Sequence, residues 1–100
     1  MPETDLEKMR HHACEVADFL KTLANENRIL ILCCLLDGEQ SVGQINQHIS
    51  ISASALSQHL AWLREAGLVT TRRQSQTIFY TLADDKVQSI LILLKQLYCQ

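Results

Sequence analysis

Proline and glycine are scarce in this chain, and long apolar runs are missing. One proline and three glycines among 100 residues leave few points at which a helix is broken, so a largely helical fold is expected. No run approaches the roughly 18 consecutive apolar residues that a membrane helix needs. The acidic, polar start of the chain does not resemble a secretory signal. We therefore expect a cytoplasmic protein with no membrane partner.

The cysteines also lack a familiar metal-binding spacing. They stand at positions 14, 33, 34 and 99, with no C-x-x-C and no close Cys/His pattern typical of a zinc finger. In a cytoplasmic chain they are expected to be reduced at rest, acting as packing residues or as sensors. No His and Asp arrangement accompanies them, so an enzyme is not expected.

Charge is distributed unevenly along the chain. The formal net charge of -2 disfavours a non-specific nucleic-acid binder. Between residues 50 and 82, however, Arg64, Arg72 and Arg73 stand against the single acid Glu65, and most other acids lie toward the two ends. A locally basic segment on an acidic body favours specific, salt-sensitive DNA binding.

Hydrophobic periodicity and capping residues predict five helices and two strands in one domain spanning residues 1–100. Helices are expected at about 5–23, 25–36, 41–49, 52–66 and 84–99, and strands at 69–72 and 77–81. Asn25, Ser41, Ser52 and Asp84 are the expected N-caps. The helix at 25–36 is apolar nearly all round and is expected at the centre of the core. The polar segment RRQSQ is expected to be a loop with two arginines near its tip.

Residues 41–66 are expected to form a helix-turn-helix, and the hairpin at 69–82 makes it winged. Leu56, Leu60 and Leu63 give the fourth helix one apolar face. The opposite face offers short polar groups that suit a major groove about 12 Å wide. The predicted DNA contacts are Ser54, Ser57, Gln58 and His59 in the groove, Arg64, Arg72 and Arg73 at phosphate or the minor groove, and Ser52 at phosphate beside its capping role.

The alternative for this stretch is an ordinary amphipathic helix with a solvated face, followed by a surface hairpin. Trp62 is expected to pack near the core rather than to stack on a base. The last helix carries a wider apolar stripe than one small core needs, and pairing of two copies would bury the surplus. A homodimer would hold two reading helices about 34–36 Å apart, which matches a palindromic operator in double-stranded DNA.

The chain resembles the ArsR/SmtB family of winged-helix repressors over about residues 16–99. The resemblance is carried by FLKTLANENRILILCCLL, by TTRRQSQTIFYTL and, most specifically, by SASALSQHLAWLREAGLV. It implies a dimer whose interface is formed by the first and last helices, residues 5–23 and 84–99.

Metal-sensing members of that family use ligands at the start of the third helix or on the last helix. Here Ser41 and Gln44 take the places of a cysteine and an aspartate, and no histidine follows Asp84 and Asp85 on the last helix. The resemblance therefore implies no metal site and no cofactor. A zinc- or copper-responsive repressor is kept as an alternative function.

A closer resemblance is to the thiol-sensing branch typified by BigR, SqrR and HlyU, which carries one cysteine in helix two and one at the end of the last helix. The segments ILCCLL and LYC place these at Cys33 and Cys99. The resemblance implies that persulfides or related oxidants bridge the pair and change DNA affinity. Each inserted sulfur adds about 2 Å, so a pair too far apart for a disulfide accepts a polysulfide bridge more easily.

The alternative role for both cysteines is simple packing, and no activating cation is apparent beside either thiol in the sequence. Taken together, the residues and the resemblance predict a homodimeric winged-helix regulator with a Cys33–Cys99 redox switch. A protein-interaction module that uses the winged helix without binding DNA is the second alternative.

Overall fold

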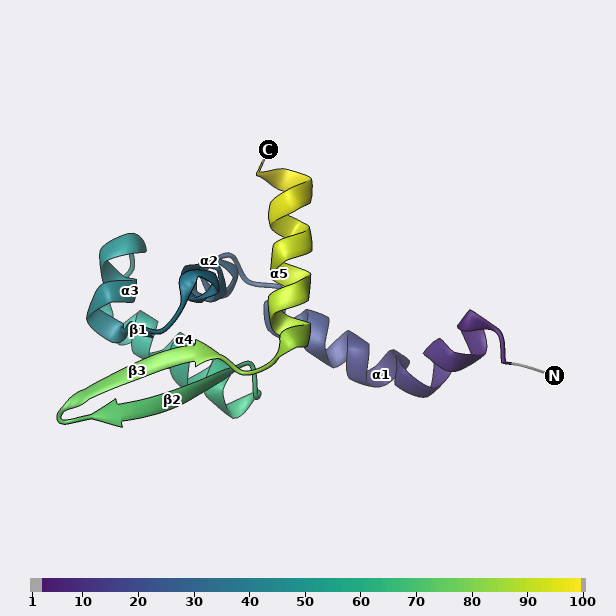
Figure 1. Ribbon diagram of the computed structural model, residues 1–100, viewed down its shortest axis with the longest axis horizontal. Coiled ribbons are helices and arrows are strands. Elements are labelled where there is room, and N and C mark those ends of the chain that lie inside the picture. The colour runs from purple at the N-terminus through teal and green to yellow at the C-terminus, as the bar shows by residue number, and fades with distance from the viewer. Residues whose placement is uncertain (1–2, 100) are drawn as a thin grey trace.

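The computed structural model describes residues 3–99, so residues 1, 2 and 100 of the predicted domain lie outside the described part. The elements follow in the order α1 (Asp5–Leu23), α2 (Glu26–Cys34), η1 (Leu35–Asp37), β1 (Gln40–Ser41), α3 (Val42–His48), α4 (Ala53–Glu65), β2 (Val69–Gln74), β3 (Thr77–Leu82) and α5 (Asp85–Tyr98). The helices form a body beside a small sheet, with α1 and α5 at one end (Figure 1). This is a mainly helical winged helix-turn-helix, as predicted.

Side-chain caps fix the helix starts. All four predicted N-caps are confirmed: Asn25, Ser41, Ser52 and Asp84 each accept a backbone N–H from the first turn of the following helix. Ser41 and Gln44 form a complete capping box, which satisfies two free N–H groups at once. The second helix ends earlier than predicted, because its last turn tightens into the 3₁₀ helix η1.

The wing differs from the expected two-stranded hairpin. The sheet has three strands in the order β1-β3-β2, because Gln40 pairs with Tyr80 and Ser41 with Phe79. A two-residue strand is too short to show an alternating pattern in the sequence. The expected RRQSQ loop is also wrong, since Arg72 and Arg73 lie within β2 and the strands are joined only through residues 75–76.

The core lies between α2, α3, α4 and the first half of α5. Its fully buried side chains are Ile31, Leu32, Ile45, Leu56, Leu60, Leu63, Val69 and Leu91. The second helix is central through Ile31 and Leu32, but Leu30 on its other side is 45% exposed. Burial of the three α4 leucines fixes which face of that helix points outward, as their spacing predicted.

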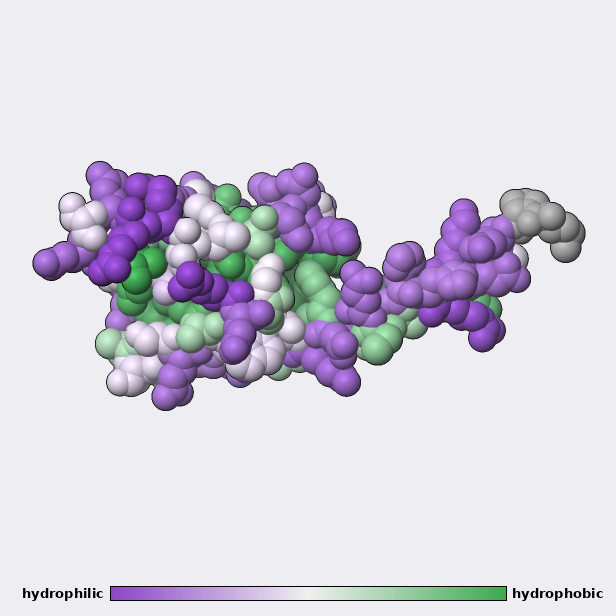
Figure 2. All heavy atoms as spheres, turned by 90° about the horizontal axis from the view of Figure 1, so that it is seen from below, coloured by the Kyte–Doolittle hydropathy of each residue, from purple (hydrophilic) through white to green (hydrophobic). Residues whose placement is uncertain are grey.

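Helices α1 and α5 leave apolar side chains uncovered. The large exposed ones are Leu6, Met9, Val16 and Leu20 on α1, and Ile92, Leu93, Leu97 and Tyr98 on α5. The molecule measures 56 × 31 × 21 Å, and α1 extends away from the body as an arm (Figures 1 and 2). Within residues 3–99, none of the helices has the length and apolar character needed to cross a membrane.

Candidate DNA-binding surface and cysteine site

Helix α4 presents most of the predicted DNA-contacting side chains to solvent. Ser54, Ser57 and Gln58 are exposed, whereas His59 is half-buried. Ser52 lies at the start of the helix, where its Oγ accepts the N–H of Ala55 at 3.1 Å. Its hydroxyl is therefore engaged in capping, as expected, and the remaining polar face is available for hydrogen bonds to base edges.

A groove of about 550 Å³ separates α4 from the wing. Its walls are formed by Ser57, Ala61, Arg64, Glu65 and Tyr80. The fold thus brings two predicted contacts, Ser57 and Arg64, together with a tyrosine that the sequence analysis missed. A signal was available in the sequence, because tyrosine hydroxyls are common donors to phosphate and Tyr80 lies within the predicted wing at residues 69–82. Residues that are far apart in the chain therefore share one concave surface.

The two wing arginines project from opposite faces of β2, because successive residues of a strand alternate in direction. Arg72 belongs to the face of its cross-strand partner Phe79, and Arg73 to the face of Ile78 and Tyr80. Arg73 thus shares its face with the tyrosine that lines the α4 groove. Its Nε donates to the Ser75 carbonyl at 3.3 Å, and it has no ion-pair partner within residues 3–99.

Arg72 is held by an acid outside the hairpin. Its Nε and Nη2 donate to the two carboxylate oxygens of Glu39 at 3.0 and 2.6 Å, and its Nη1 donates to Gln74 Oε1 at 2.9 Å. The guanidinium also lies 4.8 Å from the ring centre of Phe79. The hydrogen bond from Arg72 lowers the pKa of the Glu39 carboxyl, and that bond in turn raises the pKa of Arg72.

Trp62 lies outside the buried core. Its side chain is 41% exposed, and the guanidinium of Arg28 stacks over it at 3.7 Å from the ring centre. The expectation of a near-core position is therefore wrong, although the ring does pack against a neighbour. The reason is helical geometry, because Leu63 points into the core and the preceding residue lies about 100° away around α4.

Cys33 is half-buried on α2, and Cys99 is exposed at the C-terminal end of α5. Burial raises the pKa of the Cys33 thiol, Cys99 raises that pKa further, and Lys95 lowers it. The fold therefore brings these three groups within electrostatic reach of one another. Lys95 is the cation that the sequence analysis missed. Its position one turn before Cys99 was a signal for that cysteine, but its effect on Cys33 depends on how the chain folds.

The other two cysteines have different surroundings. Cys14 is exposed on α1, away from this group, and Cys34 is half-buried. The pKa of Cys34 is raised by burial, by Cys33 and by Asp37. A groove of about 390 Å³ beside Cys99 is lined by Asp37, Lys95 and neighbouring side chains of η1 and α5. Among residues 3–99, no three His, Cys, Asp or Glu side chains gather to hold a metal ion.

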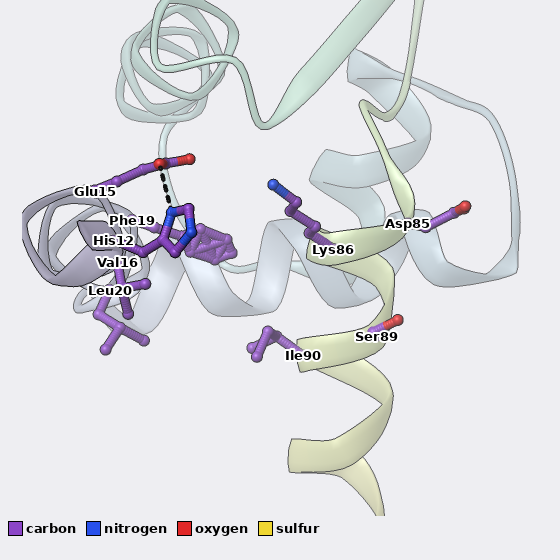
Figure 3. Close-up of a pocket in the computed structure, with 9 residues that line it drawn as sticks. All are labelled: His12, Glu15, Val16, Phe19, Leu20, Asp85, Lys86, Ser89 and Ile90. Carbon is purple, nitrogen blue, oxygen red and sulfur yellow. Dashed lines mark ion pairs between the residues drawn. The ribbon is translucent and has the colours of Figure 1, made fainter. Parts of the chain in front are cut away.

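A larger groove, of about 640 Å³, lies between α1 and the first turns of α5. Figure 3 shows Val16, Phe19 and Leu20 on α1 facing Ile90 on α5 across this space. Polar side chains, including His12 and Lys86, stand at its edge. Val16 and Leu20 in this groove are among the exposed apolar side chains of α1, so part of the uncovered apolar surface lines the groove.

Comparison with known proteins identifies the family. A family model described as "Bacterial regulatory protein, arsR family" matches residues 25–71. The transcriptional activator HlyU of Vibrio cholerae is 50% identical over 96% of this chain and 89% of its own length. This chain belongs to the ArsR family.

Solved structures of the ArsR type agree with this assignment. The transcriptional repressor BigR from Xylella fastidiosa has a TM-score of 0.91 and 41% identity, covering 97% of this chain and 99% of its own. A homodimeric winged helix-turn-helix DNA-binding domain from Mycobacterium bovis has a TM-score of 0.75 and 28% identity, covering 97% and 88% of the two chains. The protein is thus a DNA-binding transcriptional regulator rather than an enzyme, as predicted.

Proposed function

We propose that this ArsR-family chain acts in the cytoplasm as a homodimer on a palindromic operator, with Cys33 and Cys99 forming a switch that lowers DNA affinity when an oxidant or persulfide bridges them. The observation that carries the proposal is the placement of the two thiols. One lies on α2, which packs against α3 and α4 of the helix-turn-helix. The other ends α5, a helix with an uncovered apolar face.

The DNA-binding part of the proposal rests on the polar face of α4 and the neighbouring groove. Ser54, Ser57, Gln58 and His59 are proposed to meet base edges in the major groove, where Gln58 suits bidentate pairing with adenine. Arg64 and Arg73 are proposed to meet phosphate, because both are exposed on the protein surface. Ser52 adds a phosphate contact at the N-terminal end of α4, where unpaired N–H groups favour anions.

The homodimer is supported by the apolar side chains that α1 and α5 leave in solvent. A second copy would cover them, and it would also close the groove between Val16, Phe19, Leu20 and Ile90. The two-fold symmetry of such a dimer would place two α4 helices on successive turns of one DNA face.

The proposed switch reaction uses an inorganic polysulfide as both sulfur donor and oxidant. One cysteine thiolate attacks an inner sulfur, forms a Cys–S–S bond and expels a shorter polysulfide anion. The second thiolate then attacks the sulfur chain on the first cysteine and expels sulfide, which leaves a polysulfide bridge between the two residues. Lys95 supports this chemistry, because its positive charge favours thiolate at Cys33 and attracts the anionic donor.

Mass spectrometry of the unreduced protein tests the bridge directly. After polysulfide treatment, a peptide pair joining Cys33 to Cys99 with added sulfur atoms is expected, and it should disappear in Cys33→Ser and in Cys99→Ser. Cys14→Ser is the matched control and should keep the bridge. A treated protein that joins Cys33 to Cys34 instead, or forms no bridge while losing DNA affinity, would contradict the proposed pair.

A further inference from the structure

In addition to the pairing of β1 with β3, a bidentate contact between distant parts of the chain joins the wing to the body. Arg72 on β2 reaches across Phe79 on β3 to place two nitrogens on the two carboxylate oxygens of Glu39, which directly precedes β1. The strand order β1-β3-β2 explains the geometry, since β3 lies between the two partners. The contact therefore spans the whole width of the sheet.

Glu39 is itself held in place from the other side. The next residue, Gln40, pairs with Tyr80 of β3, and its Nε2 donates to the Cys34 carbonyl at 2.8 Å. The carboxylate that receives Arg72 is thus attached to the end of α2 through one residue. Movement of the wing relative to the helix-turn-helix must stretch either the Arg72 contact or this anchored segment.

Arg73 and Arg72 point to opposite faces of the wing. Arg73 lies on the face of the wing that carries Tyr80, and Tyr80 lines the groove together with Ser57 and Arg64 of α4. Arg72 lies on the opposite face, with its charge already compensated by Glu39. Two adjacent arginines with the same expected role therefore have different surroundings.

We propose that Arg72 is a positioning residue that sets the angle of the wing through Glu39, while Arg73 carries the contact of the wing with DNA phosphate. The inference rests on the proposed DNA-binding function and assigns separate tasks within it. A wing that is correctly placed for only part of the time binds DNA more weakly in proportion to that fraction.

The rival role for Arg72 is direct phosphate contact, with Glu39 acting as a competitor for the guanidinium. The two roles predict opposite changes in DNA affinity when the Glu39 carboxylate is removed. Removing an acid that competes with phosphate strengthens DNA binding and raises its salt dependence by about one phosphate contact. Removing an acid that positions the wing weakens binding, even though the protein becomes less negative.

The test measures operator affinity of the reduced protein by fluorescence anisotropy at several salt concentrations. Glu39→Gln and Arg72→Gln are each expected to weaken binding by roughly three- to tenfold, and the double variant should be no weaker than either single one. Their salt dependence should match wild type. Arg73→Gln should weaken binding and lower the salt dependence by about one phosphate contact.

Two control variants separate positioning from general charge effects. Glu26→Gln removes an exposed acid from the first turn of α2, outside the proposed DNA-binding surface, and is expected to bind as tightly as wild type. Glu39→Asp keeps the charge but shortens the reach, and it should weaken binding toward the Glu39→Gln value. Thermal unfolding of each variant shows that it is folded.

The outcomes distinguish this inference from the function on which it rests. A wild-type protein that fails to bind its promoter DNA overturns the proposed function. A wild-type protein that binds while Glu39→Gln or Glu39→Asp binds equally or more tightly overturns only the positioning role. A lowered salt dependence in Arg72→Gln would likewise assign that arginine to phosphate.

Discussion

The side chain of Gln40 donates a hydrogen bond to the backbone carbonyl of Cys34 at 2.8 Å. This bond joins the cysteine-bearing end of α2 to the strand that pairs with the wing. Cys33 lies in the last turn of α2, so a Cys33–Cys99 bridge would act on this end of the helix. A physical connection therefore exists between the proposed switch and the proposed DNA-binding surface, through a segment only a few residues long.

Gln40→Ala is expected to uncouple the switch from DNA binding. The substitution removes the bond to Cys34 and also removes Gln40 Oε1, a buried atom without a hydrogen-bond partner among the described residues. Loss of the hydrogen bond lowers stability, and loss of the unpaired buried oxygen raises it. The free energy of unfolding should therefore change by less than about 1 kcal/mol. The ratio of operator affinities before and after polysulfide treatment should fall toward one. An unchanged ratio would show that coupling takes another route.

Lys95→Gln is expected to slow modification of Cys33. Burial raises the pKa of this thiol and Lys95 partly offsets that effect, so loss of the ammonium should raise the pKa further. Thiolate is the reactive form, and its fraction grows as pH rises toward the pKa. The alkylation rate of Cys33 should therefore be lower in the variant at any pH below its pKa, with the rate profile shifted to higher pH. Lys86→Gln, on the first turn of α5, is the control and should leave the profile unchanged.

Ser75 is the one residue within 3–99 other than glycine that has a positive φ, at 56°. It lies in the two-residue turn of the wing, where glycine adopts such a conformation without steric cost. Ser75→Gly is expected to stabilise the protein by about 0.5–1 kcal/mol, and Ser75→Val to destabilise it. Urea unfolding measures both. A Val variant as stable as wild type would contradict the strain at this turn.

Leu97→Glu is expected to convert the proposed dimer to a monomer. Leu97 is 61% exposed on α5, so the substitution perturbs no buried packing in the single chain. In the dimer it would bury a charge without a partner, which is costly. Sedimentation of the variant should give half the wild-type mass. Leu30→Glu changes an exposed leucine on α2 and should leave the mass of the dimer unaltered. A Leu97→Glu variant that is still dimeric would show that the interface does not include this part of α5.

Local signals in the sequence were sufficient for most of the secondary structure. Ser52 and Asp84 mark helix starts because capping depends on atoms only two or three residues away. The spacing of Leu56, Leu60 and Leu63 fixes the outward face of α4 for the same reason. These features determined both the winged-helix architecture and the polar surface that is proposed to meet DNA.

Features that depend on residues far apart in the chain could not be predicted in the same way. The pairing of Gln40 with Tyr80 and the contact of Arg72 with Glu39 appear only once the strands are assembled. The influence of Lys95 on Cys33 likewise depends on how α5 packs beside α2. Arg72 was expected at a loop tip for this reason, and its compensated charge could not be anticipated.

A sulfur bridge between Cys33 and Cys99 is proposed to lower operator affinity, and fluorescence anisotropy measures that affinity. The reduced, chelator-treated protein is titrated onto its own promoter DNA before and after addition of inorganic polysulfide. We expect polysulfide to cause a loss of DNA binding that a thiol reductant reverses. Cys33→Ser and Cys99→Ser should each abolish this loss, and Cys14→Ser should behave as wild type. Tight binding that is indifferent to polysulfide would show that Cys33 and Cys99 do not control DNA affinity.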